Sequence, residues 1–323
     1  SWSIFSCRAL VSIQLPSTVD VSQPEQSFER FEVRFESGRE HCSAWLYLPA
    51  GADSSAVPAV VMGHGLGATR EMGLAPFAER FASAGLAALV FTYRNFGDSE
   101  GHHRQVVSVK GQLRDWESAL AFVKTVPQVD ASRVAVWGTS FGGGHAITIA
   151  SRHAELKAAV AQCPFTDGTA SAGTLGLTAT MRMFALVAKD QIARLRGRAA
   201  TLPIAASPGE LALMNAPDAL PGYRNLLPPN TSWVNNTPAR SILHIIRYRP
   251  GRAAKEVQVP ILFCVSAADT VAPSEQTLTY AQQAPRGDVR IYDAGHFDFY
   301  LGEVQRRLAT EQTEFLIGHL SSA

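Results

Sequence analysis

One segment of the sequence could supply a serine nucleophile. Residues 138–142 read GTSFG, with an apolar run before them (residues 133–137) and a small-residue stretch after them (residues 143–147). A serine in a sharp turn between a strand and a helix exposes its Oγ, and glycines flank it because a Cβ there would collide with the neighbouring elements. The same pattern also occurs in ordinary turns. Ser140 is therefore a candidate nucleophile that needs a base and an acid elsewhere in the chain.

Asp269 and His296 are the candidates for that acid and base. A serine hydroxyl needs a base to accept its proton, and the base needs a carboxylate to fix its tautomer and stabilise its charged form. Asp269 follows the apolar run 261–265, and His296 follows the run 289–292, directly before the last predicted helix. Asp269 could instead cap a helix or a turn. Asp293 and Asp298 lie too close to His296 in the chain to be its partner, and we interpret them as turn and capping residues.

A glycine-rich loop after the first core strand could stabilise an oxyanion. Residues 62–69 read MGHGLGAT. Backbone N–H groups in such a loop, together with the N–H that follows the nucleophile, stabilise negative charge on a former carbonyl oxygen. The predicted donors are Leu66 and Phe141. We expect His64 to brace this loop and to border the substrate pocket without exchanging protons. A phosphate cradle is disfavoured, since neither G-x-x-x-x-G-K-[ST] nor G-x-G-x-x-G is present.

The elements that must position these residues alternate along the chain. Residues 28–35 and 42–48 alternate apolar and polar side chains and predict an antiparallel hairpin. Short apolar runs at 59–62, 86–91, 134–137, 158–161 and 261–265 are typical of parallel strands buried on both faces. A helical apolar stripe over 109–123 includes Trp116, which we interpret as core packing. The pattern predicts an α/β fold with a mostly parallel, doubly wound sheet.

The alternation stops between residues 165 and 256. Seven prolines between residues 203 and 238 exclude one long helix there. We predict an N-terminal extension (1–27), a core (28–164 and 257–323) and a mainly helical cap inserted at 165–256. An apolar helix over 177–195 could present Met181 and Phe184 to the substrate, with Phe297 on the core side, or could simply pack the cap on the core.

Composition limits the partners. The net charge of +1 provides no attraction for nucleic acid or an anionic membrane, and no apolar run reaches the roughly 18 residues of a spanning helix. Cys7, Cys42, Cys163 and Cys264 form no C-x-x-C pair, so we expect them to be reduced. No metal or cofactor is expected. Without a recognisable secretion leader, we expect a cytoplasmic protein; no oligomeric state is indicated.

With these residues identified, the chain resembles the α/β-hydrolase superfamily from about residue 28 to 320. The resemblance rests on residues 63–67, 93–99, 138–142, 295–300 and Asp269, which are similar to a dienelactone-hydrolase-like branch that includes polyketide-pathway thioesterases and acyltransferases. It implies the α/β-hydrolase fold, a Ser140–Asp269–His296 triad, and Leu66 and Phe141 as oxyanion donors. It implies no particular substrate.

The expected function is hydrolysis of a carboxylic ester, thioester or lactone of a small, apolar acyl substrate through an acyl-enzyme. An acyltransferase would use the same triad. A peptidase is less expected, because the 27 residues before the first predicted strand leave no room for a propeller domain. A non-catalytic ligand receptor on the same scaffold is disfavoured by the complete set of catalytic groups.

Overall fold

The computed structural model describes residues 27–172 and 177–321. The predicted N-terminal extension, except for its last residue, and Cys7 lie outside this part of the chain. The other three cysteines, Cys42, Cys163 and Cys264, are buried and free.

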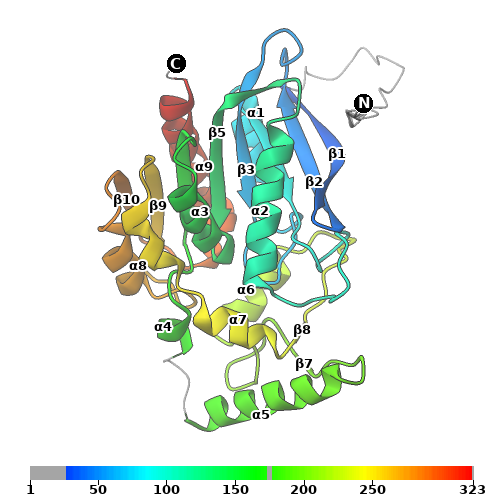
Figure 1. Ribbon diagram of the computed structural model, residues 1–323. Helices are drawn as coiled ribbons and strands as arrows, with labels where there is room; N and C mark the ends of the chain where they lie inside the picture. Colours follow the sequence, from blue (N-terminus) through cyan, green and yellow to red (C-terminus); the bar gives the residue numbers. More distant parts are fainter. Residues whose placement is uncertain (1–26, 173–176, 322–323) are drawn as a thin grey trace, which may run out of the picture.

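An eight-stranded sheet forms the centre of the molecule, in the order β1-β2-β4-β3-β5-β6-β9-β10 (Figure 1). Strand β2 pairs antiparallel with β1 and β4, and the remaining neighbours pair in parallel. The strands are β1 Phe28–Ser37, β2 Glu40–Pro49, β3 Val57–Gly63, β4 Ala87–Phe91, β5 Val129–Thr139, β6 Ala158–Gln162, β9 Ile261–Ser266 and β10 Gly287–Tyr292. The predicted hairpin and mostly parallel sheet are confirmed.

Helices cover both faces of the sheet and create two apolar layers. Strand β4 shows how the sequence demands this: Leu89 and Phe91 point into one layer, whereas Val90 points into the other. Because successive strand residues face opposite sides, a continuous apolar run must be covered twice. Helices α2 (Val109–Val123), α3 (Phe141–Arg152) and α8 (Ser274–Ala281) pack on the first side, and α1 (Ala75–Ser83) and α9 (Gly302–Leu320) on the second. Trp116 is fully buried in the first layer, as core packing requires.

Between β6 and β9 the chain leaves the sheet and builds a group of short elements beyond the carboxyl ends of the parallel strands (Figure 1). Met183 and Val187 of helix α5 (Leu177–Arg194) pack against Leu202 and Ile242 in a separate small cluster. The elements are α4 Gly168–Ala172, α5 Leu177–Arg194, β7 Thr201–Leu202, α6 Ala219–Asn225, β8 Thr237–Pro238, α7 Ser241–Arg247 and the 3-10 helix η1 Pro250–Glu256. We refer to residues 165–256 as the cap segment.

None of the helices in residues 27–172 and 177–321 combines the length and the apolar character needed to cross a membrane.

Candidate active site

Ser140 lies in a strained turn between β5 and α3. Its φ of 55° and ψ of −119° place a non-glycine residue in a region that L residues rarely adopt. The flanking glycines are required sterically. A Cβ on Gly138 would collide with the carbonyl of Gly142, and a Cβ on Gly142 would lie 2.5 Å from the carbonyl oxygens of Gly63 and His64. The turn therefore holds the Ser140 side chain above the carboxyl end of the sheet.

The structure brings the predicted acid and base to this serine. His296 Nε2 lies 3.1 Å from Ser140 Oγ, and His296 Nδ1 lies 2.8 Å from Asp269 Oδ2. All three side chains are buried. The other oxygen of Asp269 accepts the backbone N–H groups of Val271 and Ala272 at 2.8 and 2.7 Å. Asp269 thus bonds the turn before α8 with one oxygen and His296 with the other.

The surroundings of His296 favour its charged form. Burial alone would lower the pKa of His296, but the neighbouring Cys163 and the Asp269 carboxylate raise that pKa well above its ordinary value. An Nδ1–H that donates to Asp269 leaves the Nε2 lone pair directed at the Ser140 hydroxyl. The arrangement can accept a proton from Ser140 and keep the resulting imidazolium stable.

The predicted oxyanion loop lies against the nucleophile turn. A Cβ on Gly65 would be 3.3 Å from Ser140 Cβ, which shows how closely the loop approaches the serine. Phe141 is the first residue of α3, where backbone N–H groups have no partner within the helix. The Leu66 carbonyl accepts the Tyr223 hydroxyl, and the Gly67 carbonyl accepts Trp233 Nε1–H at 2.8 Å. The cap segment therefore bonds this loop through two aromatic side chains.

His64 is an internal brace of this loop. Its side chain is completely buried, its Nδ1 bonds the Gly65 carbonyl at 2.9 Å, and its Nε2 accepts the Tyr93 N–H at 3.3 Å. Burial lowers the pKa of His64 to about 3, so the ring stays neutral. With both ring nitrogens bonded inside the protein, His64 supports the loop and presents no surface to a ligand.

The other predicted pocket residues separate into two groups. Phe297, at the start of the 3-10 helix η2 (Phe297–Tyr300), packs its ring 5.2 Å from that of His296 and 5.8 Å from that of Tyr223. Met181 and Phe184 are 64% and 54% exposed on α5 and do not face the interior of the cap segment, where Met183 and Val187 are buried instead. A pocket role for Met181 and Phe184 stays a prediction.

The sequence did not reveal the polar side chains that bond Thr139, the neighbour of Ser140. Tyr300 bonds Thr139, the residue before Ser140, at 2.6 Å between the two hydroxyl oxygens. Gln162 donates to the same Thr139 oxygen at 3.1 Å. Tyr223 and Trp233 were missed as well, because nothing in the proline-rich cap sequence marks one aromatic residue above another. Tyr300 stands within the predicted motif 295–300, which was the available signal for it.

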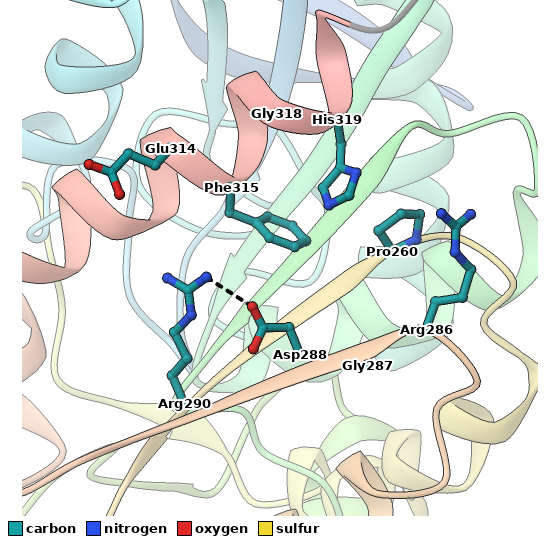
Figure 2. Close-up of a pocket in the computed structure, with 9 residues that line it drawn as sticks. All are labelled: Pro260, Arg286, Gly287, Asp288, Arg290, Glu314, Phe315, Gly318 and His319. Atoms are coloured by element: carbon teal, nitrogen blue, oxygen red, sulfur yellow. Dashed lines mark hydrogen bonds and ion pairs between the residues drawn. The ribbon is translucent and has the colours of Figure 1, made fainter.

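A hollow of about 530 Å³ lies at the end of the sheet opposite to Ser140 (Figure 2). It is built by the amino ends of β9 and β10 and by the end of α9, whereas Ser140 follows the carboxyl end of β5. Arg290 points across it to Asp288 at 2.9 Å. Its lining residues are Pro260, Arg286, Gly287, Asp288, Arg290, Glu314, Phe315, Gly318 and His319. This hollow has no part in the candidate active site. Within the described residues, no cluster of three or more His, Cys, Asp or Glu side chains could hold a metal ion.

The fold and the site together define an enzyme of the α/β-hydrolase class. The family described as serine aminopeptidase S33 (Hydrolase_4) matches residues 54–297, and the chain belongs to this family. It is similar to the quorum-quenching protein AidA of Acinetobacter baumannii, with 46% identity over 88% of this chain and 93% of that protein. It is also similar to the polyketide transferase ATR5 of Stachybotrys chlorohalonatus, with 26% identity over 84% of this chain and 91% of that protein.

Solved structures show the same fold. The α/β hydrolase GrgF from Penicillium sp. sh18 superposes with a TM-score of 0.76 at 22% identity, over 91% of this chain and 100% of that one. The resemblance to α/β hydrolases made from the sequence is confirmed.

Proposed function

We propose that this protein hydrolyses an ester, thioester or lactone of a small apolar acyl compound through an acyl-enzyme on Ser140. The observation that carries the proposal is the bonded series Ser140–His296–Asp269, with distances of 3.1 and 2.8 Å, beside the glycine loop that contains Leu66. Acyl transfer requires a nucleophile, a base, an orienting acid and N–H donors for the oxyanion, and the short distances between these residues support assigning the four roles to them.

In the proposed reaction Ser140 Oγ attacks the substrate carbonyl while His296 Nε2 takes the hydroxyl proton. The Leu66 and Phe141 N–H groups stabilise the oxyanion of the tetrahedral intermediate. Its collapse releases the leaving group, which receives the proton from His296. Water then gives a proton to His296 and attacks the acyl-enzyme. His296 returns this proton to Ser140 Oγ as the ester bond to the enzyme breaks and the acid is released. Asp269 remains ionised throughout and balances the imidazolium.

The relatives help to choose among the acyl substrates. The relative with 46% identity is named a quorum-quenching protein, which favours a small signalling molecule with an ester-type bond as the substrate of this chain. A lactone fits this description because it is an internal ester that the same two steps would open.

An acyltransferase is the second candidate, because three polyketide transferases match 81–86% of this chain at 24–26% identity. The same acyl-enzyme would then be attacked by an alcohol or amine in place of water. Adding a series of alcohols to the assay and quantifying acid against new ester distinguishes the two. If the protein is a hydrolase, the free acid should be the main product; if it is an acyltransferase, the new ester should be.

Active-site labelling tests the nucleophile. A fluorophosphonate should label the wild-type chain stoichiometrically, label His296→Ala weakly and leave Ser140→Ala unlabelled. Ser151→Ala, at the far end of the helix that Ser140 precedes, is the matched control and should label like the wild type. A Ser140→Ala variant that still reacts would refute the assignment.

A substrate panel tests the acyl group. It comprises p-nitrophenyl esters of rising chain length, lactones with short and long acyl chains, and acyl thioesters, compared by kcat/KM with Ser140→Ala as the blank. We expect kcat/KM to rise with chain length, since burying each methylene contributes about 0.8 kcal/mol. A preference for acetyl esters would exclude an apolar acyl substrate.

A further inference from the structure

Helix α5 turns large apolar side chains outward. Five of them, from the start of the helix to the residue after its end, are between 54% and 87% exposed: Leu177, Met181, Phe184, Ile192 and Leu195. Their spacings of four, three, eight and three residues place them along one face of the helix. At 1.5 Å per residue, this apolar stripe is about 27 Å long.

The other face of α5 anchors the helix to the rest of the cap segment. Met183 and Val187 are buried there. Asp190 is buried too, where it pairs with Arg240 at 3.0 Å and accepts the Ala200 N–H at 2.8 Å. The contacts of α5 with the rest of the described fold lie on this inner face, and the outward stripe is left largely exposed.

The charges beside the stripe have one sign. Within residues 177–198 the exposed charged residues are Arg182, Lys189, Arg194, Arg196 and Arg198. The one acidic residue of this segment, Asp190, is neutralised inside. A second copy of α5 packed on the stripe would bring these cations against their own counterparts, which disfavours self-association. An anionic surface with an apolar layer beneath it matches both the charges and the stripe.

We propose that α5 and the following residues to 198 dock on an anionic lipid surface. The apolar stripe enters the boundary between headgroups and acyl chains, and the flanking cations contact the lipid phosphates. This is attachment to one leaflet, which needs no spanning helix. The net charge of the whole chain is only +1, so the attraction comes from this local concentration of positive charge.

The location of α5 connects docking to the active site. Figure 1 shows α5 as the outermost element at the end of the molecule where the parallel strands have their carboxyl ends. Leu202 packs with α5, and two residues later Ile204 packs so closely on the oxyanion loop that a Cβ on Gly67 would collide with it. A protein docked through α5 would turn its cap segment toward acyl compounds dissolved in the lipid.

Vesicle flotation tests the proposal with the full chain. The vesicles are phosphatidylcholine alone or phosphatidylcholine mixed with phosphatidylglycerol. We expect flotation with the anionic vesicles, little with the neutral ones, and loss of binding as salt rises. Arg194→Gln combined with Arg196→Gln should reduce the partition coefficient about 30-fold. Ile192→Ser combined with Leu195→Ser should reduce flotation at all salt concentrations.

Ile291→Ser is the matched control, because Ile291 and Ile192 are both 58% exposed and Ile291 lies on the edge strand β10. Far-UV circular dichroism and thermal unfolding should show that the α5 variants remain folded, since the changed side chains are exposed. No flotation of the wild type with anionic vesicles would overturn the proposal. It would also be overturned if Ile291→Ser lost as much binding as the double variant at Ile192 and Leu195, or if sedimentation showed a dimer that the α5 variants dissociate without any vesicle binding.

Discussion

Tyr223→Phe should impair catalysis although the tyrosine lies in the cap segment, 83 positions after Ser140 in the chain. The Tyr223 hydroxyl donates to the carbonyl of Leu66, the proposed oxyanion donor. The substitution removes this bond but keeps the ring, which packs 5.6 Å from Trp233 and 5.8 Å from Phe297. Its effect therefore isolates the contribution of one hydroxyl to the position of the loop.

The magnitude follows from burial. Leu66 and Tyr223 are both buried, so the carbonyl would be left without its partner. An unsatisfied buried acceptor costs about 1–3 kcal/mol. If that cost is expressed mainly when the oxyanion forms, kcat falls about 5- to 150-fold, since about 1.4 kcal/mol corresponds to a factor of ten. Loss of an entire oxyanion donor, at about 100- to 1000-fold, sets the upper limit.

The assay is steady-state hydrolysis of a p-nitrophenyl ester, with kcat and KM determined separately. A loss confined to the transition state lowers kcat and leaves KM nearly unchanged. Tyr280→Phe is the control, because it deletes a hydroxyl that bonds Asp167 at 2.8 Å and does not touch the loop. It should retain wild-type kcat.

Two results would refute the reasoning. Equal kcat values for Tyr223→Phe and the wild type would mean that the hydroxyl does not position the loop. A raised KM with unchanged kcat would mean that Tyr223 binds the substrate and does not act through Leu66.

The remaining predictions concern proton transfer and packing. Only the neutral ring of His296 can accept a proton, so kcat/KM should rise as pH increases. Because the pKa of His296 is raised, the midpoint of this pH profile should lie above the ordinary histidine pKa of about 6.5. Asp269→Asn should lower that midpoint and reduce kcat by about 10⁴; a flat profile between about pH 5 and 8 would contradict the role of His296 as the base. Gly142→Ala should destabilise the protein by about 1–3 kcal/mol or more in urea unfolding, because its Cβ would meet two backbone carbonyls. Gly318→Ala, in helix α9 with no atom within 4 Å of the added Cβ, should instead stabilise by about 0.5–1 kcal/mol; a loss of stability there would invalidate the comparison.

The pattern of apolar residues and glycines was sufficient to predict the sheet and the turn that holds Ser140. Residues 87–91 are apolar without interruption, and a strand of that kind is stable only when helices cover both sides. The glycines at 138 and 142 are needed because a Cβ would collide with nearby backbone. This requirement is characteristic of the turn itself, so it can be recognised in the sequence. Asp269 and His296 could also be identified from the sequence. Each follows a predicted strand, and the carboxyl ends of parallel strands lie at one edge of the sheet.

The contacts between the cap segment and the site depend on how the chain folds and could not be predicted from the sequence. The bond from Tyr223 to Leu66 joins residues 157 positions apart, and no periodicity in the sequence records it. Helix α5 shows the same limit. Apolar residues occur around much of its circumference, so the pattern could not distinguish Met183, which is buried, from Met181 and Phe184, which are exposed. Which face of such a helix is covered depends on its packing partners, here Leu202 and Ile242, and these are assembled only when the chain folds.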